Sequence, residues 1–538
     1  MTDDVTMGSG RDTEIVLFMR LLHDRMAGGG RAVLERASTY AGLGHRVTVV
    51  VLGREAVAAV ARLRRTGAIH RTVRLLYFCR DAPRWSDHVA AAHHTPIPLP
   101  LPTGPGVTIE LVERTKGRSS RVYHVDGTPR ARVDFEATGE PTGCTVLDDA
   151  GRVVERWHCD TEGRPAILDR VDPDREVAVH RTFVVDGRYR WLEVDLELSE
   201  GRGVARRPGA TEPGTTTFAQ VIAAWLDREL AHRRRVVVFA DGENVSQHVL
   251  RAMRHPGVRG VSVLHNSHTD HPHTADAPTK ENWSAFLRDD RNVDLVVCLT
   301  ARQREHLAAR YPGMPLTVVH HSVPPAQPVD VVRDPHTAVF VGRLAPQKRL
   351  AHLVEAFRLV VAEVPQARLD VYGTGAEQPE LEAQVEAAGL AGNVRFLGFT
   401  QTPQRAFASA AVAVMTSLYE GLPLTLTEGM AVGTPFVAYD IDYGPAEVIR
   451  DGVDGVLVPP GDVPGLAREI VRIMTDPPYA ARLRERAVEV VDRFSPERYA
   501  RAWTDVLARV AAERPEPASG AARPADRTID VTEEVVGA

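Results

Sequence analysis

The sequence predicts an α/β protein with two doubly wound parallel-sheet domains that face a cleft, and an antiparallel β-rich insertion in the first domain. Three observations lead to this fold class. The chain opens with a strand, glycines, a helix and a strand over residues 14–51. Short alternating segments separated by turn pairs fill residues 107–198. Between residues 339 and 421, four strand-like runs each lead into a glycine, as expected along one rim of a parallel sheet.

Length and charge limit the class of protein. A chain of 538 residues is long enough for about three domains. A hydrophobic content of 43% and a charged content of 25% are those of an ordinary globular protein. The balance of 65 basic and 71 acidic residues gives a net charge of -6, so no overall basic field favours nucleic acid or an anionic membrane.

The N-terminus and the cysteines predict a cytoplasmic location. The first apolar run, residues 15–19, is too short for a signal peptide or a membrane span. The four cysteines have no CxxC spacing, so we expect reduced, buried thiols rather than a zinc site or a disulfide framework.

The first domain begins with a strand over residues 14–19, a polar loop that contains Gly28, Gly29 and Gly30, a helix to Gly44 and a second strand to residue 51. The same pattern returns after the insertion, with a helix near residues 218–232 and strands at 236–240, 261–264 and 295–299. We expect this sheet to close near residue 320, and Pro324, Pro325 and Pro328 to form a stiff linker.

The insertion shows alternating segments separated by turn pairs, among them Asp126-Gly127 and Asp186-Gly187. Asp-Gly between alternating runs is a strong hairpin signal. A polar, glycine-rich connection over residues 200–216 follows. The insertion should therefore be an antiparallel sheet of its own.

The second domain carries basic groups directly after a strand. The run 339–342 ends in a glycine and is followed by Arg343 and Lys348 before a helix, which makes a natural cradle for phosphate.

Two acids flank a predicted helix start near Pro423. Gly421 permits a sharp turn, so Glu420 falls in the loop and Glu428 in the helix, roughly 8 to 12 Å apart. Taken alone, the two acids are more often solvated groups at a helix start. Together with the upstream cations, they suit the two ends of one elongated ligand.

These motifs resemble those of retaining GT-B glycosyltransferases of glycosyltransferase family 4, with G-R-L-x-x-x-K followed by E-x7-E in residues 337–503. The resemblance implies that Arg343 and Lys348 hold the donor diphosphate, Glu420 the sugar hydroxyls and Glu428 the ribose. It implies that His265, with His268 second, lies beside the donor sugar. It also implies donor contacts at further positions: Gly29, Gly30, Gly373, Phe399, Gly421 and Leu422.

The resemblance sets the expected domain boundaries. The N-terminal Rossmann-like domain would comprise residues 1–104 and 201–325, the insertion 105–200 and the nucleotide-sugar domain 326–494. Residues 495–512 would form a helix that crosses back to the first domain, opened by a Ser495 cap, and residues 513–538 a disordered tail. In its pattern of short alternating segments and turns, the insertion is similar to that of bacterial α-glycosyltransferases of wall teichoic acid and serine-rich surface proteins. This similarity implies that the insertion binds the acceptor or forms a homo-oligomer.

The segment from His265 to His273 holds four histidines and allows three interpretations: a zinc site, a solvated loop, or an active-site loop, which the position at a strand end favours. Asp440-Ile-Asp442 matches a DxD metal motif, but coincidence explains it better, and Tyr443 beside it could border either substrate. Asp241 and Glu243 could orient an acceptor hydroxyl or form a solvated turn.

The resemblance implies a hexosyltransferase that retains configuration and needs neither a metal nor another cofactor. A nucleotide sugar, UDP-glucose or UDP-N-acetylglucosamine, would be the donor, and a hydroxyl of teichoic acid or of a surface protein the acceptor. The alternatives are a catalytically silent nucleotide-sugar scaffold, a transferase for a lipid or small-molecule acceptor, and a phosphorylase-like or sucrose-type transferase.

Overall fold

The structure is a computed structural model that describes residues 13–19, 22, 28–53, 57–82, 97–113, 118–136, 139–160, 162–185, 189–196, 204–206, 216–241, 245–288, 293–324 and 329–511. Several predicted features lie outside these residues: the Asp186-Gly187 turn, Glu243, the linker prolines Pro325 and Pro328, and the tail 513–538.

The N-terminal lobe is built on a parallel sheet, with seven strands in the described residues in the order β17-β16-β15-β14-β1-β2-β3. The strands are β1 (Thr13–Met19), β2 (Arg46–Val51), β3 (Arg74–Tyr77), β14 (Arg235–Asp241), β15 (Val258–Leu264), β16 (Leu295–Cys298) and β17 (Leu316–Val318). The helices are α1 (Gly28–Gly42), α2 (Val57–Arg65), α3 (Phe78–Asp81), α4 (Phe218–Glu229), α5 (Val245–Ala252), α6 (Glu281–Arg288) and α7 (Ala301–Arg310). Strand order reverses between β1 and β14, which is where ligands bind in doubly wound sheets.

The insertion is an antiparallel meander, with ten strands among the described residues in the order β13 to β4. They are β4 (Val107–Glu113), β5 (Ser119–Val125), β6 (Thr128–Phe135), β7 (Pro141–Leu147), β8 (Val153–Cys159), β9 (Pro165–Asp172), β10 (Val177–Val185), β11 (Tyr189–Asp195), β12 (Val204–Arg206) and β13 (Thr216–Thr217). Asp126 and Gly127 have φ values of 50° and 82°, so this Asp-Gly pair makes the hairpin turn that the sequence predicted.

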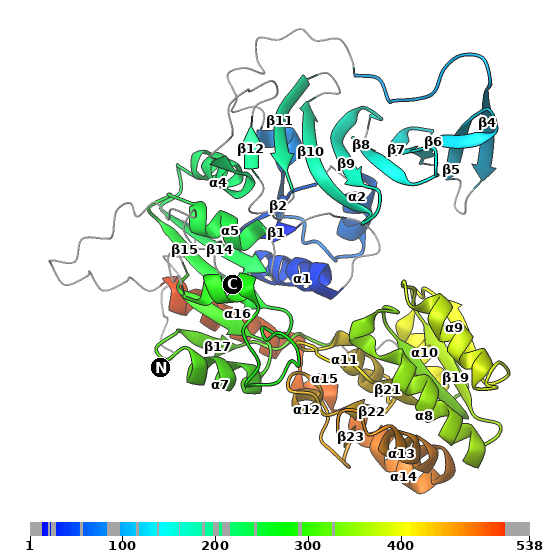
Figure 1. The fold of residues 1–538 in the computed structure, drawn as a ribbon. Helices are drawn as coiled ribbons and strands as arrows, with labels where there is room; N and C mark the ends of the chain where they lie inside the picture. Colours follow the sequence, from blue (N-terminus) through cyan, green and yellow to red (C-terminus); the bar gives the residue numbers. More distant parts are fainter. Residues whose placement is uncertain are drawn as a thin grey trace, which may run out of the picture.

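The antiparallel sheet extends beyond its predicted end at residue 200, because β12 and β13 lie in the stretch assigned to a polar connection. One end of the sheet lies over the N-terminal lobe, and β4 is at the far end (Figure 1). The rings of Phe78, Phe183 and Phe218 join insertion and lobe, with centroids 5.4 Å apart.

The C-terminal lobe has a second parallel sheet, with six strands in the part of the chain described here, ordered β20-β19-β18-β21-β22-β23. The strands are β18 (Asp334–Val341), β19 (Arg368–Tyr372), β20 (Val394–Gly398), β21 (Ala410–Met415), β22 (Phe436–Tyr439) and β23 (Val456–Val458). The helices are η4 (Pro346–Lys348), α8 (Leu350–Glu363), α9 (Gln378–Ala387), α10 (Pro403–Ser409), α11 (Leu424–Ala431), α12 (Pro445–Val448), α13 (Val463–Thr475), α14 (Pro477–Ala487) and α15 (Val490–Arg493). Strand order reverses here between β18 and β21.

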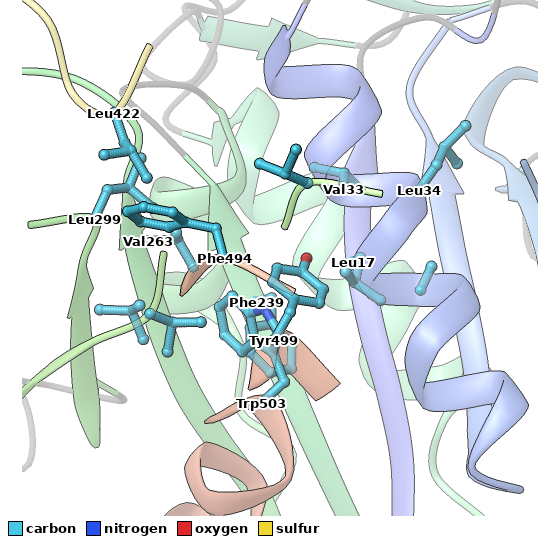
Figure 2. Close-up of a cluster of buried hydrophobic side chains, with 14 of the residues drawn as sticks. Leu17, Val33, Leu34, Phe239, Val263, Leu299, Leu422, Phe494, Tyr499 and Trp503 are labelled. Carbon is cyan, nitrogen blue, oxygen red and sulfur yellow. The ribbon is translucent and has the colours of Figure 1, made fainter. Parts of the chain in front are cut away.

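The last described helix, α16 (Pro496–Ala511), leaves the C-terminal lobe and runs along the N-terminal one (Figure 1). Ser495 caps it, since its Oγ accepts a hydrogen bond from the Arg498 amide at 3.3 Å. Tyr499 and Trp503 lie beside Phe239 of β14 (Figure 2), and the Tyr40 hydroxyl donates to the Trp503 carbonyl at 2.8 Å. Burial of the apolar side chains of α16 therefore stabilises the contact between the two lobes.

A search of the described helices finds none that combines the length and the apolar character needed to cross a membrane.

Candidate active site

The predicted cation and acid of the C-terminal lobe meet at the point where its strand order reverses. Lys348 follows β18, Glu420 follows β21, and the Lys348 Nζ forms an ion pair with Glu420 Oε1. The loops are held together by backbone contacts: the Leu418 amide donates to the Gln347 carbonyl at 2.7 Å, and the Thr416 hydroxyl to the Lys348 carbonyl at 2.8 Å. The placement of this pair follows from the strand order and not from local sequence.

Arg343 lies beside the same two loops. Its side chain is exposed and donates to Gln347 Oε1 at 3.2 Å, while Gln347 Nε2 donates to the Tyr419 carbonyl at 2.8 Å. Arg343, Lys348 and Glu420 thus share one rim of the sheet, and the exposed guanidinium is open to an anion from solvent.

Glycines let neighbouring strand ends approach closely at this rim. A Cβ on Gly373 would lie 1.7 Å from the Gly342 carbonyl oxygen, and one on Gly375 would lie 2.0 Å from that of Leu344. Since neither position has room for a side chain, these glycines set how closely the strand ends approach one another at this rim.

Gly421 brings the two lobes into contact. A Cβ at this position would lie 2.2 Å from the His265 carbonyl oxygen, so the end of β15 lies directly against the residue after Glu420. The sequence argument for Gly421 was a sharp turn, but this residue has no positive φ, and the close approach of the lobes is what requires glycine. The helix begins at Leu424, with Pro423 as its N-cap.

The His265 side chain belongs to a buried charged network of the N-terminal lobe. Its Nε2 lies 2.7 Å from Asp241 Oδ1, the same oxygen that the Arg36 guanidinium contacts. Burial disfavours the charged form of Asp241, but Arg36 and His265 outweigh it and lower the pKa to about 2. The His321 ring stacks on His265 with centroids 5.8 Å apart, and burial lowers the pKa of His321 to about 3.

The other histidines of this loop have protein partners. His268 is buried, with Nδ1 3.4 Å from Gln303 Nε2, and burial lowers its pKa to about 4. The His273 ring lies 4.0 Å from that of Tyr419 in the other lobe. Within the described residues, no three His, Cys, Asp or Glu side chains are arranged to hold a metal ion, so the zinc interpretation gains no support.

The DxD sequence makes contacts between the lobes. Asp442 forms an ion pair with Arg302 at 3.0 Å, and the buried Tyr443 hydroxyl lies 3.0 Å from His306 Nδ1. Nearby, Glu447 accepts from the Ala301 amide at 3.1 Å and lies 2.7 Å from His320 Nε2. Asp442 thus contributes to the closed arrangement of the lobes.

Glu428 lies apart from this group, on a cavity of about 1120 Å³ between the lobes. Its carboxylate forms an ion pair of 2.6 Å with Arg31 of α1. Thr402, Gln404 and Arg405 of the C-terminal lobe also line the cavity, whereas Arg343, Lys348 and Glu420 do not.

The predicted loop position of Gly29 and Gly30 needs correction, and the burial of Leu422 narrows how it can contact a ligand. Gly29 and Gly30 lie in the first turn of α1 and not in a loop before it, although first-turn amides lack helical acceptors and can still face an anion. The Leu422 side chain is buried in the core near Leu299 (Figure 2), so only its backbone is available to a ligand. Phe399, by contrast, is 55% exposed after β20.

Sequence reasoning missed Arg31 and Arg36. Both lie in a helix whose arginines look like ordinary solvated residues, and their partners are 397 and 205 positions away. Asp241 was identified as an acid that orients the acceptor or as part of a solvated turn, and the structure shows that it is buried and paired with Arg36.

Comparison with known families agrees with this arrangement. Residues 327–490 match the family Glycosyl transferases group 1. The chain carries a glycosyl transferase group 1 domain. This domain coincides with the C-terminal lobe and contains Arg343, Lys348, Glu420 and Glu428.

Two curated relatives are similar over longer stretches. Poly(glycerol-phosphate) alpha-glucosyltransferase of Bacillus subtilis is 28% identical over 413 residues, 74% of this chain and 59% of that protein. Poly(ribitol-phosphate) alpha-N-acetylglucosaminyltransferase of Staphylococcus aureus is 24% identical over 285 residues, 53% of this chain and 57% of that protein. The chain thus spans less than two thirds of the length of these relatives.

Solved structures show that the fold is GT-B. A mutant of S. aureus TarM, crystallised with Fondaparinux, alpha-GlcNAc-glycerol and UDP, has a TM-score of 0.68 at 17% identity and covers 92% of this chain and 99% of its own. The pneumococcal O-GlcNAc transferase GtfA, in complex with UDP and GlcNAc, has a TM-score of 0.65 at 16% identity and covers 93% and 100%. The predicted GT-B fold with an antiparallel insertion is confirmed.

Proposed function

We propose that the protein is a glycosyltransferase that moves a hexose or N-acetylhexosamine from a UDP-sugar to a hydroxyl of a cell-wall polymer or a surface protein. The observation that carries this proposal is the meeting of Lys348 and Glu420 at the strand reversal of one lobe, with Gly421 against His265 of the other. A cation and an acid side by side between two lobes suit a ligand with an anionic leaving group and a hydroxyl-rich sugar.

Each charged residue has a distinct task in this proposal. Lys348 and Arg343 bind the diphosphate and neutralise the charge that develops as it leaves, which lowers the barrier by roughly 2 to 4 kcal/mol. Glu420 accepts hydrogen bonds from the sugar hydroxyls, and Glu428 binds the ribose at the edge of the cavity. Arg343 is exposed, and Lys348 must exchange its present carboxylate partner for the diphosphate.

We further propose that the reaction retains configuration and needs no metal. The leaving phosphate oxygen takes the proton of the acceptor hydroxyl on the same face of the sugar, so neither a nucleophile nor a divalent cation is required. The contacts between the lobes, such as the one between His273 and Tyr419, favour exclusion of water and hence transfer over hydrolysis.

The relatives suggest the acceptor. The names of the two curated relatives specify poly(glycerol-phosphate) and poly(ribitol-phosphate), so a polyol-phosphate polymer is the first acceptor to test. The GtfA subunit of Streptococcus gordonii, named as a peptide N-acetylglucosaminyltransferase, is 28% identical over 185 residues, 33% of this chain and 36% of that protein, and supports a protein acceptor as second choice.

The test is transfer with mass detection. Purified protein is incubated with UDP-glucose, UDP-N-acetylglucosamine or GDP-mannose and with polyol-phosphate polymer, peptide or lipid acceptors, and released nucleotide is measured alongside. We expect UDP release that depends on the polymer and a product with α configuration by NMR. Tight UDP binding without turnover would support the alternative of a silent nucleotide-sugar scaffold. If sugar is transferred preferentially to a lipid, a lipid replaces the polymer as the proposed acceptor. Chelator should leave the rate unchanged.

Two further features of the proposal concern assembly and location. The insertion would form a homo-oligomer through β4, at the end of the described sheet, where Ile109 and Leu111 are exposed on one face. Light scattering of wild type and Ile109→Lys tests this, and a monomeric wild type would exclude it. We place the reaction in the cytoplasm, where the four buried cysteines stay reduced, and cell fractionation tests this.

A further inference from the structure

The acid at the end of β14 is oriented into the protein. Asp241 is only 5% exposed, and one oxygen of its carboxylate contacts both Arg36 and His265. A group that faces inward with two cationic or donor partners is poorly placed to meet an acceptor hydroxyl. Any effect of Asp241 on a reaction must therefore act through a residue beside it.

The neighbour with access to the site is His265. Its side chain is 18% exposed, and its backbone carbonyl lies against Gly421, the residue after Glu420. An ionised carboxylate can only accept hydrogen bonds, so the contact of 2.7 Å requires the hydrogen to be on Nε2 of His265. In the neutral ring, Nδ1 then has no hydrogen and can accept one.

Arg36 fixes Asp241 from behind. The guanidinium is 1% exposed and lies over two aromatic rings, 4.9 Å from the centroid of Phe239 and 4.5 Å from that of Trp503. Arg36 comes from α1, Phe239 from β14 and Trp503 from α16. Three separate elements therefore determine the position of the Arg36 guanidinium and, through it, that of the Asp241 carboxylate. A buried ion pair held in this way has little freedom to rearrange.

We propose that Asp241, anchored by Arg36, is a positioning residue that fixes the tautomer of His265, so that Nδ1 accepts a hydrogen bond from a sugar hydroxyl beside Glu420. The inference rests on the proposed transferase function, and it replaces both sequence-based interpretations of Asp241, an acid that orients the acceptor and a solvated turn. The stacked His321 holds the plane of the His265 ring and adds no charge, since it is buried and neutral.

The insertion offers a matched control. Asp169 of β9 is 4% exposed, forms a bidentate ion pair with Arg181 at 2.7 and 2.9 Å, and lies 3.6 Å from His158. It therefore combines the same three residue types, in a sheet away from the strand reversals of both lobes. A variant of Asp169 therefore measures the effect of losing a buried carboxylate between an arginine and a histidine, without loss of the proposed positioning of His265.

The experiment compares Asp241→Asn with Asp169→Asn. Protein labelled with ¹⁵N-histidine gives the His265 tautomer, assigned by the signal that His265→Gln removes. We expect hydrogen on Nε2 in the wild type, a shift toward Nδ1 hydrogen in Asp241→Asn because the amide can donate to Nε2, and no change in Asp169→Asn. Transfer by Asp241→Asn should show kcat/KM at least about tenfold lower, with the Kd for UDP within about twofold. Asp169→Asn should keep the wild-type rate.

Two results would overturn the inference: Nδ1 hydrogen in the wild type, or a changed tautomer with kcat/KM unaltered. If Asp241→Asn does not fold, Arg36→Lys provides the second variant. Asp241 keeps its carboxylate in this variant, so the hydrogen should stay on Nε2, but the weaker anchor should lower kcat/KM by about threefold or more, and an unaltered kcat/KM would overturn the role of Arg36. The tautomer measurement needs no turnover, so a wild type that transfers no sugar refutes the proposed function and leaves the Asp241 assignment to be decided by NMR.

Discussion

The two lobes hold their charged groups in different ways. In the N-terminal lobe, the side chains of Asp241 and Arg36 are 6% and 1% exposed, and each is in contact with further groups of the network. In the C-terminal lobe, Lys348 and Glu420 are 16% and 10% exposed, and Arg343 is exposed. A fully buried ion pair is costly to break. The pair of Lys348 and Glu420 is also largely buried, but it lies on the same rim as the exposed Arg343, where an anionic ligand can approach and compete for Lys348. The N-terminal lobe thus holds its charged groups in fixed positions, whereas the C-terminal lobe has charged groups whose partners a ligand can replace.

The largest expected effect is the loss of stability on breaking the fixed pair. Asp241→Ala leaves the Arg36 charge buried without its carboxylate, and we expect the free energy of unfolding to fall by about 3 to 5 kcal/mol. Urea unfolding measures this. The half-exposed Arg302 and Asp442 pair is the control, since Asp442→Ala should cost less than about 1 kcal/mol. Equal losses in the two variants would show that burial does not distinguish these pairs.

The next largest effect concerns Glu420 and Lys348, whose pairing a ligand can replace. Glu420→Gln keeps the shape of the side chain but removes the charge that the proposal assigns to the sugar hydroxyls, and kcat should fall by about a hundredfold. The Kd for UDP, measured by calorimetry, should change little, because the proposed diphosphate contacts come from Arg343 and Lys348. Lys348→Met should weaken UDP binding instead. If the Glu420 variant loses UDP binding but keeps transfer, the two roles have been assigned the wrong way round.

A smaller effect is the response of stability to pH. The pKa of His321 is lowered from 6.5 to about 3, so the unfolded state takes up the proton first as the pH falls. The contribution of neutral His321 is complete above pH 6.5 and is lost progressively toward pH 3, with a slope of at most about 1.4 kcal/mol per pH unit. Thermal unfolding between pH 7 and pH 4 should show a shallower decline for His321→Asn. A slope identical to wild type would mean that His321 is not buried in its neutral form.

The smallest effect is expected at the ion pair between the lobes. Arg31 is 54% exposed and holds the Glu428 carboxylate that the proposal assigns to the ribose. Arg31→Ala releases Glu428 at a cost of less than about 1 kcal/mol in pairing energy, so UDP should bind up to about threefold more tightly. Titration at low and high salt should show this gain only at low salt. Weaker UDP binding would instead make Arg31 part of the ligand site.

Most of the fold could be predicted from the sequence, because buried parallel strands appear as continuous apolar runs and Asp-Gly pairs mark hairpins. The short strands β12 and β13 could not, since three and two residues carry no periodicity. The cations and acids of the C-terminal lobe lie in motifs of consecutive residues and could be identified. The Arg36 network could not, because its members are scattered over the chain and only the packing of α16 brings Trp503 to Arg36.

The return of α16 to the first lobe also matters for biosynthesis. Trp503 covers one side of Arg36, so the histidine network of the N-terminal lobe is complete only once α16, which follows the second sheet in the chain, has been synthesised and packed. A nascent or truncated protein that stops after the second sheet keeps the pair of Lys348 and Glu420 but lacks the Trp503 ring over Arg36.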